Sequence, residues 1–131
     1  MSDLYPQATH DLSRLRRALA PEAAAAFHKF SEAVFADGAL PRKTKHIIAV
    51  AVAHVTQCPY CIRGHTRAAL RDGASQKELM EAIWVAAEMR AGAAFAHSIL
   101  AIDEMGESDL TAANDHPAPT LATGERHGHR M

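Results

Sequence analysis

The sequence predicts an all-α fold, and two observations lead to that class. Alanine and other strong helix formers recur along most of the chain, whereas aromatic residues make up only 5% of it. Apolar residues also recur three and four positions apart, which is the spacing of one helix face. We expect about six helices in one domain over residues 1–107. A flexible tail is expected over residues 108–131, which are rich in proline, glycine, threonine and histidine.

The first helix is expected over residues 9–19, where three leucines lie at helical spacing. The second should begin at Pro21, because proline suits the first position of a helix. Glu22 then favours the positive end of the helix dipole. Asp37-Gly38 should end this helix, since glycine commonly terminates helices.

The third helix should begin at Pro41, but its residues leave its type open. Its β-branched residues stand in near-alternation with alanine, a pattern that also suits a strand. The fourth helix is expected to run from Pro59 to about Arg71, where Asp72-Gly73 closes it.

Two further helices are expected in the second half of the domain. Ser75 and Glu78 have the spacing of a capping box, with Ser75 as the N-cap and Glu78 reaching back to it. A sixth helix should run from about Ala91 to Met105. Gly92 is expected to loosen the join between the fifth and sixth helices.

Composition and charge argue against several classes of function. The net charge of −1 gives no electrostatic reason to expect binding to nucleic acid or to an anionic membrane. We expect no apolar run long enough to span a bilayer, and the N-terminus shows no secretory signal. The chain is therefore expected in the cytoplasm. Its low net charge and many apolar helix faces favour a homo-oligomer.

Both cysteines of the chain lie in the stretch TQCPYCIRGH, residues 56–65. Cys58 is expected at the N-cap of the fourth helix and Cys61 in its first turn, where backbone N–H groups and the helix dipole favour a thiolate. His65 follows Cys61 by four residues and so shares its face. Its imidazole could accept the thiol proton directly or through one water. The local interpretation is a redox-active dithiol with an attached base.

Three other interpretations of this motif stay open on the residues alone. A thioredoxin or glutaredoxin domain uses CPYC, but it needs strands that the sequence does not predict. A zinc site could take Cys58, Cys61 and His65 with His54 or His97, although no second ligand pair is evident. The cysteines could also be small apolar residues of the core.

Residues 40–98 resemble the carboxymuconolactone decarboxylase superfamily and, within it, the alkylhydroperoxidase AhpD-like proteins. The resemblance rests on a helix leading into CxxCxxxH, then an A-L-x-x-G-A turn and a capped helix, all in register. It implies that the third element is a helix. It also implies an all-α AhpD-like domain in a homo-oligomer, commonly a trimer or hexamer. No metal or organic cofactor is expected.

The resemblance implies a thiol-dependent peroxidase that reduces hydrogen peroxide or small organic hydroperoxides. Cys61 would attack the peroxide, Cys58 would resolve the product to a disulfide, and His65 would belong to the proton relay. A dithiol reductant, such as a lipoylated protein, would restore the thiols. Dipole reasoning alone favours Cys58 as the more acidic thiol. The alternatives are a CxxC disulfide reductase of unknown substrate and a non-catalytic redox-sensing or binding oligomer.

One position departs from the family pattern. The relay of the family commonly starts with a glutamate twelve residues before the first cysteine, and His46 occupies that position here. A histidine can pass a proton near neutral pH but cannot supply the negative charge of a carboxylate. The relay could therefore draw on Glu32 or Glu81. His54, one turn before Cys58, is a further candidate for the site.

Overall fold

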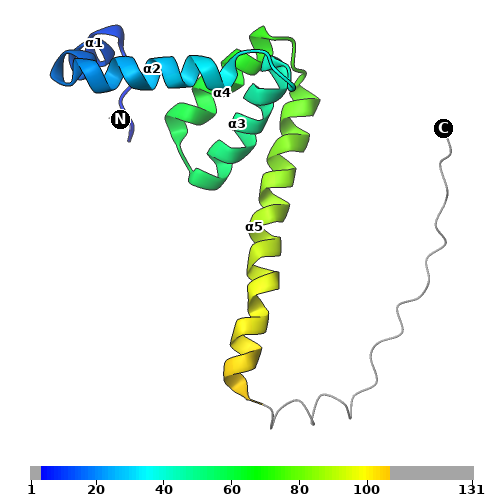
Figure 1. Ribbon diagram of the computed structural model, residues 1–131. Coiled ribbons are helices and arrows are strands. Elements are labelled where there is room, and N and C mark those ends of the chain that lie inside the picture. The colour runs from blue at the N-terminus through cyan, green and yellow to red at the C-terminus, as the bar shows by residue number, and fades with distance from the viewer. Residues whose placement is uncertain (1–3, 107–131) are drawn as a thin grey trace, which may run out of the picture. The chain divides into compact units, whose positions relative to one another are not determined.

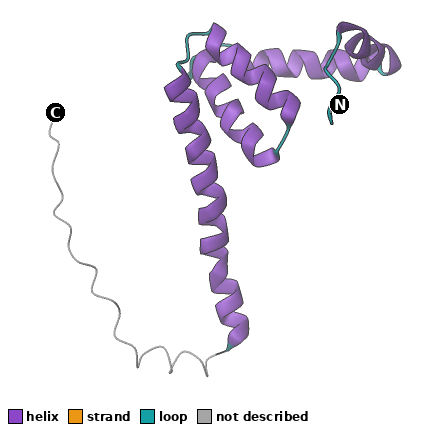
Figure 2. Ribbon diagram, turned by 180° about the vertical axis from the view of Figure 1, so that it is seen from behind, coloured by secondary structure: helices purple, strands orange, loops and turns teal. Residues whose placement is uncertain are grey.

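The computed structural model describes residues 4–106, and the chain divides into two units, residues 1–93 and 94–131. Over the described range the secondary structure consists of five α-helices without strands (Figures 1 and 2). The predicted all-α class is therefore confirmed. The third predicted element, whose type the residues left open, is a helix. The expected tail over 108–131 lies outside the described residues.

The first four helices begin and end close to the predicted positions. They are α1 (His10–Leu19), α2 (Pro21–Phe35), α3 (Arg42–Thr56) and α4 (Pro59–Arg71). The agreement follows from local capping. The Thr9 side chain accepts a hydrogen bond from the Leu12 N–H at the start of α1, and Pro21 is the first residue of α2.

The fifth and sixth predicted helices are one helix, α5 (Gln76–Met105), so the expected count of six is wrong for this part of the chain. The capping box forms as predicted, because the Ser75 N–H donates to Glu78 Oε1 and the Glu78 N–H donates to Ser75 Oγ. Gly92 does not interrupt the helix. A glycine inside a helix costs only about 1 kcal/mol, and the alanines around it are strong helix formers.

The length of α5 also revises the expectation that no segment could span a bilayer. By length and composition alone, Gln76–Met105 is apolar enough to cross a membrane. Glu88 and Arg90 oppose such a placement, because each charge near the middle of a membrane helix costs about 2.5–3.5 kcal/mol. The N-terminal part of α5 instead packs into the protein core through Leu79 and Ile83.

The core of the first unit lies where α3 and α4 run side by side in opposite directions (Figure 1). It is small: the buried cluster consists of Val50, Ala69, Ala74 and Leu79, with Ile47 and Ile83 partly buried against it. Alanine in this cluster allows the helices to approach closely. Val50 is the one large side chain in the described part of the chain that is fully buried.

The connection between α3 and α4 places the cysteine motif. Gln57 ends α3 in the left-handed conformation, with φ 59° and ψ 43°, and its N–H donates to the Ala53 carbonyl. Cys58 follows as the N-cap of α4. Because only these two residues separate the helices, the packing of α3 on α4 fixes the position of the thiols.

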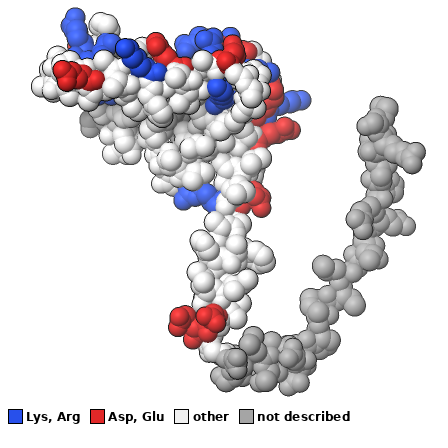
Figure 3. Space-filling view, viewed as in Figure 1, with Lys and Arg blue, Asp and Glu red and all other residues white. Residues whose placement is uncertain are grey.

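Large apolar side chains remain exposed along α5. Within the second unit, Phe95 is 82% exposed and Ile99 is 69% exposed. Residues 94–102 carry no charged side chain, and this stretch of α5 is white in the space-filling view (Figure 3). Such a surface is unusual for a helix in water, and it bears on self-association.

Candidate active site

The two thiols lie at the start of α4, where the sequence predicts them. Cys58 is the N-cap, and its Sγ accepts a hydrogen bond from the Cys61 N–H at 3.2 Å. Both residues are half-buried and neither is in a disulfide. This position exposes Cys58 Sγ to the partial positive charge of the helix N-terminus.

The two thiols differ in acidity. A hydrogen bond from the Cys61 side chain, followed by the Cys61 N–H, lowers the pKa of Cys58. The same thiol–thiol hydrogen bond, together with burial, raises the pKa of Cys61. Cys58 is therefore the thiol that ionises first, in agreement with the dipole reasoning from the sequence.

A pocket of about 600 Å³ opens onto both thiols, and we call it the thiol pocket. It is lined by Pro6, Gln7, Ala8, Leu12, Ser13, Arg16, Cys58, Tyr60 and Cys61. The Tyr60 hydroxyl donates a hydrogen bond to the Pro6 carbonyl at 2.7 Å, and the Tyr5 ring lies edge-on to the Tyr60 ring. The tyrosine between the cysteines thus holds the N-terminal segment beside the thiols.

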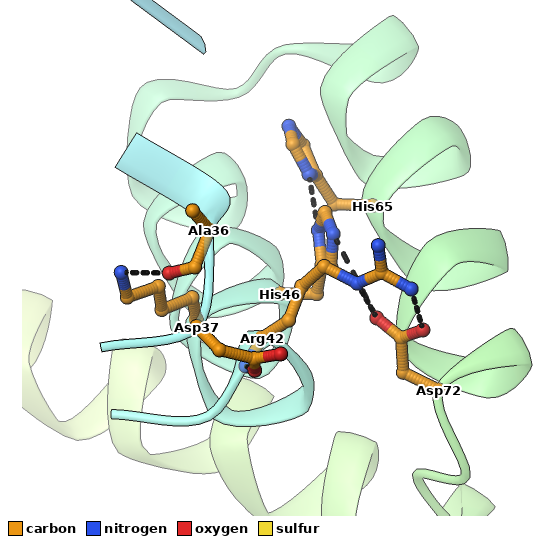
Figure 4. Close-up of polar contacts among 7 residues, drawn as sticks. Ala36, Asp37, Arg42, His46, His65 and Asp72 are labelled. Carbon is orange, nitrogen blue, oxygen red and sulfur yellow. Dashed lines mark hydrogen bonds and ion pairs between the residues drawn. The ribbon is translucent and has the colours of Figure 1, made fainter. Parts of the chain in front are cut away.

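His46 on α3 and His65 on α4 form a direct contact, with their Nδ1 atoms 3.1 Å apart (Figure 4). One ring must donate a proton and the other must accept it. Phe35 stacks on both rings, with centroid distances of 4.6 Å to His46 and 5.0 Å to His65. The stacking holds the rings in place and shields them from water.

Both imidazoles favour the neutral form. Burial lowers the pKa of His65, and burial followed by the neighbouring His65 lowers the pKa of His46. Asp72 acts in the opposite direction on His46, but the net shift is downward. Near neutral pH both rings can therefore accept a proton.

Asp72 supplies the carboxylate that the sequence could not locate. Its Oδ2 lies 4.0 Å from His46 Nε2. Arg42 binds it in a bidentate manner, with Nε–Oδ2 at 3.0 Å and Nη2–Oδ1 at 2.8 Å (Figure 4). This guanidinium lowers the pKa of Asp72 and keeps it ionised. A negative charge beside Nε2 favours a proton on that nitrogen, which leaves His46 Nδ1 to accept from His65.

Sequence reasoning missed Asp72 because Asp72-Gly73 was interpreted only as a helix stop. A signal was available: Asp72 follows His65 by seven residues, two helical turns along the same face. Of the two carboxylates suggested by the sequence, Glu32 is engaged elsewhere, since its Oε1 lies 2.9 Å from His28 Nε2. Glu81 makes no ion pair within residues 4–106.

His54 is engaged away from the thiols. Its Nδ1 lies 2.7 Å from the Val50 carbonyl, so the ring donates to the backbone of its own helix one turn back. In the described range, neither thiol is hydrogen-bonded to a histidine. No group of three or more potential metal ligands comes together among these residues either.

The thiols and the histidine pair occupy neighbouring but different surfaces. His46 and His65 line a pocket of about 430 Å³ together with Phe35 and Arg42, and the cysteines do not line it. The link between the two groups is α4 itself, since His65 lies one turn after Cys61 on the same helix face.

Comparison with known proteins points to one family. The sequence model of the carboxymuconolactone decarboxylase family matches residues 21–104. "Uncharacterized protein 4 in cox locus" of Paracoccus denitrificans is 62% identical over 84 residues, which span 64% of this chain and 76% of that protein.

Two solved structures share both sequence and fold. A carboxymuconolactone decarboxylase family protein from Legionella pneumophila is 37% identical, with a TM-score of 0.56, over 60% of this chain and 70% of its own. A protein from Methanobacterium thermoautotrophicum is 38% identical, with a TM-score of 0.61, over 63% of this chain and 93% of its own. The matched family region contains the cysteine motif, the histidine pair and Asp72.

Proposed function

Since the chain belongs to the carboxymuconolactone decarboxylase family, we propose that it is a thiol-dependent peroxidase of that family. Its substrates would be hydrogen peroxide or small organic hydroperoxides. The observation that carries the proposal is the hydrogen bond from the Cys61 N–H to Cys58 Sγ at the wall of an open pocket. It stabilises a thiolate, which is the nucleophile that attacks a peroxide.

The reaction needs two thiols and one base. The Cys58 thiolate attacks the terminal oxygen of the hydroperoxide, and the O–O bond breaks. The leaving alkoxide takes up, through solvent, the proton that Cys58 lost on ionisation and becomes an alcohol. Cys58 is now a sulfenic acid. Cys61 gives up its proton and attacks the Cys58 sulfur, the S–O bond breaks, and the hydroxide leaves as water. Each turnover oxidises two thiols to one disulfide and reduces one peroxide.

This order of attack is the reverse of the order that the family resemblance implies. The resemblance assigns the attack to Cys61 because His65 is close to it along α4. The geometry favours Cys58, because it is the N-cap and has the lower pKa. His65 then serves the second step, in which Cys61 must lose its proton.

The histidine pair supplies the proton acceptor for that step. His65 would take the Cys61 proton, through a bridging water, on Nε2, which is not engaged by His46. The Nδ1 proton of His65 would then pass to His46 across the 3.1 Å contact. The charge that develops on His46 would be stabilised by Asp72, itself held by Arg42. Asp72 is thus a positioning residue that acts through His46.

Asp72→Asn is expected to lower the rate of disulfide formation, and with it kcat, about tenfold, a part of the 10²–10⁴-fold that general acid–base catalysis typically contributes. The change removes the charge that raises the pKa of His46, so that pKa should fall further. The acidic limb of the pH profile should accordingly move to lower pH. Steady-state profiles and an NMR titration of the imidazoles would measure both effects.

Glu81→Gln is the matched control for this variant, because it removes one carboxylate from α5 without touching the histidine pair. Its pH profile should equal that of the parent protein. An Asp72→Asn variant that folds normally and keeps both the parent rate and the parent profile would remove Asp72 from the relay.

The cycle also requires an electron donor. We propose a dithiol, such as the dihydrolipoyl group of a lipoylated protein, which would attack the Cys58–Cys61 disulfide and leave both thiols reduced. A reducing cytoplasm is the compartment that suits such a donor. The working form is proposed to be a homo-oligomer, a trimer or hexamer, because the apolar face of α5 is uncovered in a single chain.

Repeated turnover tests the proposed function. Purified protein given excess organic hydroperoxide and dihydrolipoamide should consume many equivalents of peroxide per chain and yield one alcohol per peroxide. The rate without protein is subtracted. Consumption of a single equivalent would instead indicate a redox sensor. Reduction of disulfides without any loss of peroxide would indicate a disulfide reductase.

A further inference from the structure

The thiol pocket combines apolar walls with one cationic side chain. Pro6, Ala8 and Leu12 supply apolar surface to the same pocket as the cysteines. Arg16 is the only Asp, Glu, Lys or Arg side chain that lines the pocket in the described part of the chain. Leu12 and Arg16 are four residues apart, so one face of α1 presents first an apolar and then a charged side chain to the same space.

Among the residues that the structure describes, Arg16 has no charged partner, unlike Arg14 and Arg42, and it is the one arginine that lines the thiol pocket. Arg14 is paired with Asp11 at 2.6 Å, and Arg42 is held by Asp72. Within residues 4–106, Arg16 makes no ion pair or side-chain hydrogen bond. Its guanidinium is therefore free to bind an anionic group, and its planar fork suits a carboxylate.

We infer that the thiol pocket binds organic hydroperoxides that carry a carboxylate on an apolar body, with Arg16 as the residue that binds the carboxylate. The inference rests on the proposed peroxidase function and narrows its substrate class. The peroxide group would lie at Cys58, the apolar body against Leu12 and Pro6, and the carboxylate at Arg16. A fatty-acid hydroperoxide has this chemistry, whereas hydrogen peroxide cannot reach both ends of the pocket.

Thiol alkylation tests the anion site without requiring peroxidase activity. Iodoacetate and iodoacetamide attack the same thiolate, but only iodoacetate is anionic. The ratio of their rate constants with the reduced protein should fall about fivefold in Arg16→Ala, the loss expected for one partly solvated charge contact. Arg16→Lys should restore part of the ratio. High salt should lower the parent ratio toward that of Arg16→Ala.

Arg17→Ala is the matched control. It removes the same charge from the next position of α1, but Arg17 does not line the thiol pocket. Its ratio should equal that of the parent protein. Equal ratios in the parent, Arg16→Ala and Arg17→Ala proteins would overturn the inference whatever the protein does with peroxides.

Turnover then separates this inference from the proposed function. The parent protein should have a higher kcat/KM for a fatty-acid hydroperoxide than for its methyl ester, both below the concentration at which they aggregate. Arg16→Ala should reduce that preference about fivefold. Equal values for acid and ester in the parent protein would refute the carboxylate site and leave the peroxidase standing. Turnover of neither compound, nor of any other hydroperoxide, would refute the peroxidase itself.

Discussion

Cys58→Ser is expected to abolish hydroperoxide turnover, with a loss of at least about 10³-fold, because serine offers no thiolate at neutral pH. Cys61→Ser should abolish turnover equally, since the sulfenic acid can no longer be converted to the disulfide. The two variants should differ in what accumulates. Cys61→Ser should consume one equivalent of peroxide and hold a sulfenic acid at Cys58, which dimedone traps and mass spectrometry locates. Cys58→Ser should show no comparable fast phase.

The opposite result is equally informative. A rapid single turnover in Cys58→Ser, with dimedone bound at Cys61, would establish the order that the family resemblance implies. Normal turnover in either serine variant would exclude the dithiol cycle altogether. Circular dichroism of both variants controls for folding, and serine is close enough to cysteine in size to preserve the N-cap.

The pH dependence of alkylation should report the same assignment. The pKa of Cys58 is lowered from its ordinary value of 9.0, chiefly by the hydrogen bond from Cys61. The thiolate of the parent protein should therefore form below pH 9.0. In Cys61→Ala the side-chain donor is lost, and the midpoint should move upward. A midpoint that stays in place or moves downward would show that Cys61 does not stabilise the Cys58 thiolate.

Local sequence signals were sufficient to predict a helix end wherever the residues that cap it lie within one turn of that end. Pro21, Pro59 and the Ser75–Glu78 capping box each act within one turn, so their effect can be predicted from a short window. The same kind of local signal predicted Cys58 at an N-cap. The predicted join between two helices at Gly92 was wrong, because a single glycine is a weak signal. The strong helix formers on both sides of it outweigh that signal.

The histidine site shows the limit of this kind of reasoning. His65 was chosen by its spacing from Cys61, and His46 because the family resemblance implies a relay residue at its position. The structure brings their rings together. Asp72 joins them only because α3 packs antiparallel to α4, which places His46 opposite the end of α4. That pairing of distant segments has no signature in a short window. The carboxylate of the proposed proton relay could therefore be identified only from the three-dimensional structure.

The apolar surface that a single chain leaves uncovered leads us to expect an oligomer. Phe95, Ile99 and Ile102 lie at positions i, i+4 and i+7 of α5 and form one exposed face of the second unit. Burying each such side chain contributes about 1.5–3 kcal/mol. The native protein is therefore expected to sediment as a complex of several chains, with a trimer or hexamer as the specific prediction.

The double variant Phe95→Asp/Ile99→Asp should weaken that association by at least about 10³-fold, because it removes two apolar contacts and places carboxylates in a face that must lose water. Sedimentation velocity over a range of concentrations would measure the loss. His97→Asp is the control for charge: it adds one carboxylate, against two in the double variant, about 200° around the helix from Phe95 and at a position that is already polar. A parent protein that sediments as a stable monomer, with a melting temperature independent of its concentration, would contradict the prediction. In that event the apolar face of α5 must have another occupant, since water alone cannot solvate it favourably.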